Sequence, residues 1–392
     1  MATKKKSNSD SASTNAINDG KWAGLFYRTE EQFQKTYQET GIIGFDLAIS
    51  DGKGLPVGGC IMMYSAPGSG KSTLCADIAE RLLYKNEQAN IPYKCLFIDL
   101  EGGSDGLAVN LGLSKYATPE HGCRLNYLPM GGLTWNKLEE FFKAIENDEP
   151  PFDNVRLVII DSLNSIQSEA QADKDKAINA GDFGSSAKDR YNLYNKYVLD
   201  LKKKGVTFLF ISQQRTKQGA SQFEDQKKSA TADGDDHIVD CILKLSKSQG
   251  GNNADVKKVE VLSAATGEKA KIAPRFLCTI QAPNKNRFCA DLSAVPVLVK
   301  VGKGIQNWYT VKKMLETYKL MKNAGSANAP RYVMNQKVID FVGEQFEQEC
   351  GKEECQKWIA SHVTPIREFF KSVDLYHLTV DPDKVKAVLE GE

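Results

Sequence analysis

The sequence lacks any long hydrophobic run, although 41% of its 392 residues are hydrophobic. Because a helix needs about 20 consecutive apolar residues to cross a bilayer, we expect no membrane partner. The lysines at positions 4–6 are followed by serine, asparagine and aspartate, not by the apolar segment of a secretory signal. We therefore expect a cytoplasmic protein.

A net charge of either sign is also missing. The chain has 51 Lys and Arg residues against 50 Asp and Glu residues, a formal net charge of +1. Long-range attraction to nucleic acid or to a membrane surface needs a larger charge of one sign, so any nucleic-acid site must be a local patch. The sequence has no repeat of fixed period, which excludes repeat architectures.

Nine cysteines are present, an odd number. Five of them lie inside apolar stretches, as buried thiols do: Cys60, Cys75, Cys95, Cys241 and Cys278. This usage is typical of a reducing compartment and argues against a framework of disulfides.

From residue 40 onward, short apolar runs alternate with helical patterns. Strands are expected at Cys60–Tyr64, Cys95–Asp99, Val155–Ile160, Val206–Ile211 and about 238–246, 256–263 and 275–281. Helices are expected from Ser72 to about Lys85 and at about 135–147 and 186–204. Continuous apolar strands between helices predict an α/β fold, with a mainly parallel twisted sheet covered by helices on both faces.

Composition also divides the chain into regions. Residues 1–20 are polar, with little to bury, and are expected to form a disordered tail. Residues 21–38 hold spaced apolar and aromatic side chains, which could pack on their own domain or act as an oligomerisation segment on a neighbouring subunit. An α/β core is expected at 39–303, and a small helical C-terminal domain at 304–392.

A glycine-rich loop follows the first of these strands. Its residues are Ala66, Pro67, Gly68, Ser69, Gly70, Lys71, Ser72 and Thr73. The glycines let backbone N–H groups turn towards phosphate oxygens, Lys71 adds a positive charge, and the Ser72 hydroxyl can ligate Mg²⁺. The usual pattern, G-x-x-x-x-G-K-[ST], has glycine where this chain has Ser65. The loop predicts a site for ATP and Mg²⁺.

Three polar residues follow buried strands, at the edge where open α/β sheets bind ligands. Asp161 ends one strand and is expected to hold Mg²⁺ through water. Glu101 follows another and could orient or deprotonate an attacking water. Gln213 follows a third and could sense the γ-phosphate. For Glu101 and Gln213, spacing alone leaves an ordinary loop residue as an equal alternative.

Residues 40–59 carry a motif of their own, T-G-x-x-x-x-D-x-A-[IL] followed by G-L-P-x-G. Together with the phosphate loop, this motif resembles the start of the RecA recombinase core. Further segments match that family in the same order: Phe97–Glu101, Val158–Ser162, Phe210–Arg215 and Glu268–Phe276, the last resembling K-x-K-I-A-x-P-F. The resemblance covers about residues 38–300, and the divergence is typical of phage-encoded recombinases.

The resemblance implies an ATP-dependent DNA recombinase that forms a helical filament on single-stranded DNA and pairs it with homologous duplex DNA. Lys71, Glu101 and Gln213 would serve catalysis within one protomer. Lys269 and Lys271 would reach ATP bound to the neighbouring protomer. Single-strand-binding and loader proteins would be partners, and a phage-encoded chain would work in the host cytoplasm.

The adenine side of the site departs from the family. Asp105 would lie beside the nucleotide, but Ala108 stands about where the family often has an aromatic that stacks on adenine. The resemblance therefore implies an ATP site without fixing its selectivity for adenine.

Two loops, about 172–186 and 214–236, would face DNA. Their basic residues could meet phosphates and Phe223 could stack on bases, although acids in the second loop oppose a purely electrostatic role. The candidate DNA-binding residues are Lys174, Lys176, Arg215, Lys217, Phe223, Lys227 and Lys228. The alternative is that both loops are merely solvated surface.

Three other functions use the same fold. A hexameric helicase would form a closed ring and usually needs an arginine finger. A nucleotide-gated recombination mediator would have a weak ATPase, which Ser65 and Ala108 favour. A regulator acting on proteins would have no obvious use for the long lysine-bearing loop after Gln213.

Overall fold

The computed structural model describes two compact units, Met1–Tyr37 and Gln38–Glu392. The described residues are 34–172, 188–216, 227–229, 238–248, 259–262, 269–272, 275–283, 285–289, 294–326, 329–377 and 380–390. The first unit is therefore described only from Gln34, up to the start of β1 (Tyr37–Gln38). The tail expected at 1–20 and most of the segment expected at 21–38 lie outside the described residues.

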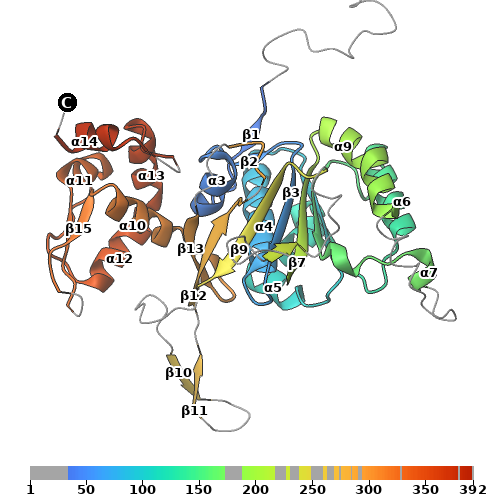
Figure 1. Ribbon diagram of the computed structural model, residues 1–392, viewed down its shortest axis with the longest axis horizontal. Helices are drawn as coiled ribbons and strands as arrows, with labels where there is room; N and C mark the ends of the chain where they lie inside the picture. Colours follow the sequence, from blue (N-terminus) through green and yellow to red (C-terminus); the bar gives the residue numbers. More distant parts are fainter. Residues whose placement is uncertain are drawn as a thin grey trace, which may run out of the picture. The chain divides into compact units, whose positions relative to one another are not determined.

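A ten-stranded sheet forms the centre of the second unit (Figure 1). Its strand order is β14-β13-β12-β9-β3-β7-β6-β4-β5, and β8 pairs with β7. The strands are β3 (Cys60–Ser65), β4 (Lys94–Asp99), β5 (Leu125–Pro129), β6 (Val155–Asp161), β7 (Thr207–Thr216), β8 (Lys227–Ser229), β9 (Cys241–Lys247), β12 (Arg275–Gln281), β13 (Val295–Lys300) and β14 (Gly304–Ile305). The strands from β9 to β5 run parallel, whereas β12, β13 and β14 pair antiparallel.

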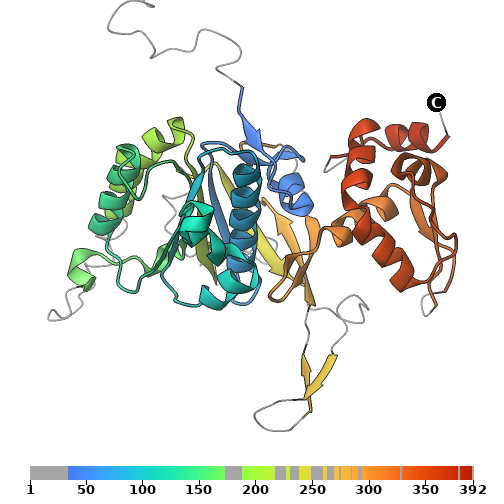
Figure 2. The same ribbon diagram turned by 180° about the vertical axis from the view of Figure 1, so that it is seen from behind.

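Helices cover both faces of the parallel strands. On one face, α6 (Trp135–Glu146), the π-helical turn η4 (Tyr194–Val198) and α9 (Leu199–Lys203) share a buried cluster with alternate residues of β3, β4, β6 and β7. The helix α4 (Lys71–Gln88) contacts the same four strands and lies across the other face, as Figure 2 shows. The predicted α/β class, with a mainly parallel sheet, is confirmed.

The local sequence explains these elements. The side chains of Met62, Leu96 and Val158 are fully buried, as runs with apolar residues on both faces require. The helix α6 begins after Thr134, whose hydroxyl accepts a hydrogen bond from the Lys137 N–H. The expected strands at 60–64, 95–99 and 155–160 are confirmed within one residue.

The expectation of a loop over 214–236 is wrong at the two stretches that the structure describes, 214–216 and 227–229. The strand β7 does not stop at Ile211 but continues to Thr216. Thr216 pairs with Lys227 and Gln214 with Ser229, so these two stretches form an antiparallel hairpin. Pairing satisfies backbone N–H and C=O groups that a polar loop would leave to water. The stretch between the hairpin strands lies outside the described residues.

The remaining elements surround the sheet. Before and beside it are α3 (Ile43–Ser50), β2 (Leu55–Pro56), α5 (Asp105–Asn110), η1 (Leu113–Ala117), η2 (Pro119–His121), η3 (Leu163–Ser165) and α7 (Glu169–Ala172). The strands β10 (Val259–Leu262) and β11 (Lys269–Ile272) form a separate antiparallel pair. The C-terminal part contains α10 (Asn307–Thr317), β15 (Met321–Asn323), β16 (Tyr332–Met334), α11 (Gln336–Val342), α12 (Lys352–Ser361), α13 (Val363–Ser372) and α14 (Pro382–Glu390). This part is mainly helical, as expected, with one short hairpin.

Polar contacts join the C-terminal part to the start of the core. The Glu39 carboxylate pairs with Lys371 at 2.8 Å and with Arg367 at 3.2 Å. The Asn307 side chain accepts a hydrogen bond from the Ile43 N–H and donates one to the Gly41 carbonyl. These contacts hold α13 and α10 against the segment that leads into α3.

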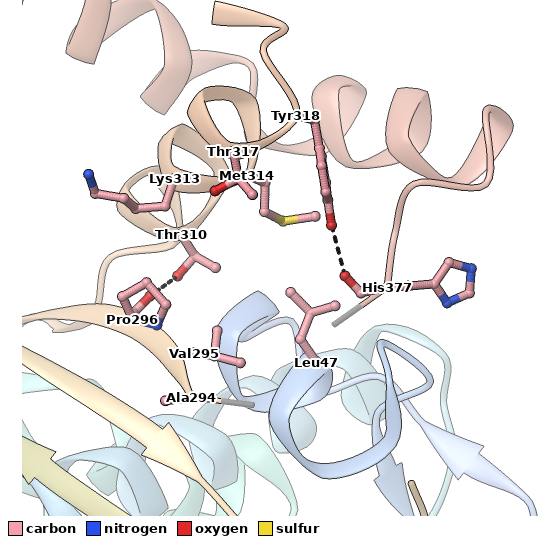
Figure 3. Close-up of a pocket in the computed structure, with 10 residues that line it drawn as sticks. All are labelled: Leu47, Ala294, Val295, Pro296, Thr310, Lys313, Met314, Thr317, Tyr318 and His377. Atoms are coloured by element: carbon pink, nitrogen blue, oxygen red, sulfur yellow. Dashed lines mark hydrogen bonds between the residues drawn. The ribbon is translucent and has the colours of Figure 1, made fainter. Parts of the chain in front are cut away.

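A pocket of about 250 Å³ opens between α3, β13 and α10 (Figure 3). Leu47, Val295 and Met314 give it an apolar lining. At its rim the Tyr318 hydroxyl donates to the His377 carbonyl at 3.0 Å, as Figure 3 shows. The pocket thus lies between the core and the C-terminal part, and its lining residues are not those of the phosphate loop.

Candidate nucleotide site

The phosphate loop connects the end of β3 to the start of α4. Gly68 and Gly70 have φ angles of 69° and 88°, in the left-handed region where a side chain would be strained. A Cβ at Gly68 would meet nothing within 4 Å, so this side of the loop is open. A Cβ at Gly70 would lie 3.2 Å from the Phe276 ring. The loop therefore needs glycine at both positions, and its exposed side is accessible to a phosphate.

Lys71 lies at the first position of α4, next to the end of the sheet. Its Nζ donates hydrogen bonds to the hydroxyl of Ser65 at 3.0 Å and to the Ser65 carbonyl at 3.3 Å. Burial lowers the pKa of Lys71, and the charges of Asp161 and Glu101 act against that shift. A half-buried ammonium at the positive end of a helix is a site for an anion.

Ser72 and Asp161 meet at the other side of the loop. The Ser72 hydroxyl donates to Asp161 Oδ2 at 2.5 Å. Burial raises the pKa of Asp161 to about 6, while the Ser72 hydrogen bond and the Lys71 charge oppose the shift. Two hard oxygen ligands so close together form the donor set that Mg²⁺ takes in phosphate sites. The structure thus brings together Ser72 and Asp161, the two residues predicted from the sequence as Mg²⁺ ligands.

Glu101 lies on the loop after β4 and is exposed. Its Oε1 accepts a hydrogen bond from the Ser162 hydroxyl at 2.9 Å and another from Gln213 Nε2 at 3.2 Å. The structure thus brings Glu101 and Gln213 together, although they are 112 residues apart in sequence. A carboxylate fixed by two donors has a defined direction in which to receive a proton from water.

Asp99 shapes the loop that carries Glu101. Its carboxylate is 1% exposed and accepts hydrogen bonds from the N–H groups of Glu101, Gly102 and Ser104, at 3.2, 2.9 and 2.8 Å. It also accepts from the Tyr127 hydroxyl at 2.8 Å. Burial, together with the carboxylates of Asp99 and Asp105, raises the pKa of Tyr127. Four donors on one buried carboxylate fix the turn between β4 and α5.

Gln213 lies near the end of β7, opposite Ser65 in the parallel register of β3 and β7. Its backbone N–H donates to Asn164 Oδ1 at 3.2 Å, and the Ser212 hydroxyl donates to the same oxygen at 3.0 Å. Asn164 belongs to η3, directly after Asp161 and Ser162. One amide therefore joins the end of β6 to the end of β7.

The remaining residues predicted to bind the nucleotide lie in α5, in the phosphate loop and at the start of α4. Asp105 is the exposed first residue of α5, and Ala108, which stands where an adenine-stacking aromatic was considered, is buried at 5% exposure. Ala66 and Pro67 are exposed at the top of the loop, Ser69 is buried with its hydroxyl donating to the Ala66 carbonyl, and Thr73 is half-buried in α4.

The candidate DNA and trans residues are only partly described. Arg215 lies opposite Lys228 in the β7–β8 hairpin, and Lys227 lies opposite Thr216. Lys269 and Lys271 lie in β11, opposite Leu262 and Glu260 of β10. Lys174, Lys176, Lys217 and Phe223 lie outside the described residues.

Sequence reasoning missed four residues of this network: Asp99, Tyr127, Ser162 and Asn164. Asp99 and Ser162 stood within the quoted strand segments, and a polar residue at the carboxyl end of a buried strand was the available signal. Tyr127 and Asn164 gave no such signal, because their roles depend on which strand ends are neighbours in space.

Within the described parts of the chain, no helix is long and apolar enough to cross a membrane. No cluster of three or more His, Cys, Asp or Glu side chains suited to a metal occurs among those residues either. The Ser72–Asp161 pair is a candidate metal site, which would share the ion with nucleotide phosphates.

A family model described as an AAA domain matches residues 52–189, about a third of the chain. No curated protein matches the sequence. The matched residues include the phosphate loop, Glu101 and Asp161. Since the strand, loop and helix around Lys71 also have the geometry of a phosphate site, this part of the chain is a P-loop ATPase domain.

Proposed function

We propose that the chain is an ATP-dependent DNA recombinase, which assembles as a filament on single-stranded DNA and exchanges strands with a homologous duplex. The observation that carries this proposal is the course of β7. This strand holds Gln213, whose side chain bonds Glu101 at the ATPase centre, and then continues into the hairpin with Arg215 opposite Lys228. A single strand thus links the nucleotide site to a basic segment.

The residues present fit ATP and Mg²⁺. The open side of Gly68 and the start of α4 would receive phosphate oxygens, and Lys71 would pair with the β- and γ-phosphates. Ser72 and Asp161 would hold the metal. When bound, Mg²⁺ neutralises negative charge on the phosphates.

The protein's own groups then divide the work. Glu101, held by Ser162 and Gln213, orients the attacking water and accepts its proton. The γ-phosphate competes with Glu101 for the Gln213 amide, so that nucleotide state changes the position of the end of β7. Lys269 and Lys271, on the separate β10–β11 pair, supply positive charge to a neighbouring protomer's nucleotide.

The trans role proposed for these two lysines supports the proposal of a filament. A site completed by lysines from the next copy of the chain works only when protomers assemble head to tail, which gives rings or helical filaments. Single-stranded DNA would then lie along the β7–β8 hairpins of successive protomers, with its phosphates near Arg215, Lys227 and Lys228. Single-strand-binding and loader proteins would act on this assembly.

A strand-exchange assay tests the proposal. The full chain is mixed with circular single-stranded DNA, homologous linear duplex, ATP and Mg²⁺, and joint molecules are separated on a gel. We expect joint molecules with homologous duplex and none with a heterologous duplex of equal length. Unwinding of a forked duplex without joint molecules, with closed rings in electron micrographs, would instead identify a helicase.

A further inference from the structure

Ser65 is the residue at which the phosphate loop departs from the usual pattern. It ends β3, its side chain is 0% exposed, and its backbone lies in register with Gln213 of β7. Where the pattern has glycine, the loop offers the lysine a carbonyl oxygen only. Here the position adds a hydroxyl in a site that bulk water does not reach.

The Ser65 hydroxyl is oriented as an acceptor for Lys71. Its Oγ donates to the Ala66 carbonyl at 3.0 Å, which commits its one proton. The lone pairs of the same oxygen then face the Lys71 ammonium, whose Nζ lies 3.0 Å away. Within the described structure, Lys71 Nζ donates hydrogen bonds to Ser65 alone, once to the hydroxyl and once to the carbonyl.

We infer that Ser65 is a positioning residue that tethers Lys71 in the nucleotide-free protein, so that ATP must displace the tether to recruit the ammonium. The Ser65 hydroxyl and the nucleotide phosphate compete for one cation. The chain therefore binds ATP more weakly than the same loop with glycine would. This inference rests on the proposed use of ATP at this loop and is independent of DNA binding.

The size of the effect follows from the kind of bond that is lost. Hydrogen bonds to a charged group are about twice as strong as bonds between neutral groups, and the buried position protects this one from water. Removing the hydroxyl is expected to tighten ATP binding about tenfold, a change of about 1.4 kcal/mol. Because the tether is absent once Lys71 contacts phosphate, the maximal turnover rate should change little.

The test measures binding of a slowly hydrolysed ATP analogue, with Mg²⁺ and without DNA, by calorimetry. Ser65→Gly restores the usual loop pattern, and Ser65→Ala removes the hydroxyl while keeping the Cβ. Both variants should bind about tenfold tighter than the wild type, with a lower KM for ATP and an unchanged kcat. If the substitutions only disturbed the structure of the loop, ATP binding would weaken. The direction of the change in affinity therefore distinguishes loss of the tether from structural damage.

A matched control is Ser50→Ala. Ser50 is also a fully buried serine, but its hydroxyl bonds the carbonyls of Asp46 and Gly54 in the α3 region. The affinity of the Ser50→Ala variant for the ATP analogue should equal that of the wild type. Equal or weaker binding by both folded Ser65 variants would overturn the inference. A wild-type chain that binds no nucleotide at all would instead overturn the proposed function.

Discussion

The Asp99 carboxylate accepts a hydrogen bond from the backbone N–H of Glu101, with Oδ1 and N 3.2 Å apart. Only Leu100 separates Glu101, the carboxylate proposed to act on water, from Asp99, the buried carboxylate that fixes its loop. The same Asp99 group also holds Gly102 and Ser104 and receives the Tyr127 hydroxyl. The position of Glu101 in the site therefore depends on a buried carboxylate that lies outside the phosphate loop.

Replacing Asp99 should slow ATP turnover while leaving ATP binding nearly unchanged. Asp99→Ala removes the acceptor for three backbone N–H groups and should lower kcat for ATP hydrolysis on the order of 100-fold, since small misplacements of a reacting group have effects of this size. The KM for ATP should change little, because the phosphate loop is held by β3 and α4. Tyr127→Phe, which removes one of the four donors, should have a smaller effect. An unchanged kcat in folded Asp99→Ala would refute the positioning role.

Asp46 predicts a dependence of stability on pH. It lies in α3 at 1% exposure, accepts a hydrogen bond from the Thr40 hydroxyl at 2.6 Å, and burial raises its pKa from 3.8 to about 7. The folded protein therefore keeps this proton up to about pH 7, while the unfolded chain releases it near pH 4. The stabilisation that the folded protein gains by keeping Asp46 protonated is fully present below pH 4 and is lost as pH rises through 7.

The Asp46→Asn variant isolates this contribution, because asparagine cannot ionise. Between pH 5 and pH 8, we expect the free energy of unfolding of the variant to rise relative to that of the wild type by on the order of 2 kcal/mol. This figure follows from about 1.36 kcal/mol per pKa unit. Urea denaturation at several pH values measures the difference, and the exposed Asp340→Asn serves as control. A constant difference across this range would show that the Asp46 carboxyl ionises normally.

Part of the site could be predicted from sequence because its signals are local. The phosphate loop is contiguous, and Asp161 and Glu101 follow apolar runs that read as buried strands. The joining contacts could not be predicted in this way. Asn164 bonds the end of β7, and Tyr127 reaches Asp99 from β5, only because β5, β4, β6 and β7 are adjacent in the sheet.

Strand ends were harder to predict than strand centres. Ile211 was expected to end its strand because polar residues follow, yet pairing with β8 carries β7 on to Thr216. Hairpin pairing depends on a second segment of the chain, and two polar segments that pair lack the apolar pattern by which a strand is recognised in a sequence. The edge strand β5 was missed for a related reason, since its partly exposed residues lack a continuous apolar run.

The lysines of β11 predict a difference between basal and DNA-stimulated turnover. Lys269→Ala with Lys271→Ala should lower the stimulated ATPase rate while leaving the basal rate and the melting temperature near wild type, because the lysines would act on the neighbour's nucleotide. Lys269→Arg with Lys271→Arg keeps both charges and should retain more activity. If stimulation is unchanged in the alanine variant, the lysines have no role in trans.

Phe223 predicts an effect on binding of single-stranded DNA. Phe223→Ala should weaken binding to an oligothymidine by about 1–3 kcal/mol, the usual contribution of one aromatic–base stack. Phe223→Trp retains an aromatic face and should bind nearly as well as the wild type. Fluorescence anisotropy at fixed salt measures both affinities, and equal binding by Phe223→Ala would place this side chain away from the bases.

The ATP hydrolysis rate with and without saturating single-stranded DNA tests the central claim most directly. The account predicts that DNA greatly increases the hydrolysis rate of the wild type. It predicts no turnover in either condition for Lys71→Ala, because this variant lacks the ammonium that would pair with the β- and γ-phosphates. Equal wild-type rates with and without DNA, or hydrolysis that survives in Lys71→Ala, would contradict it.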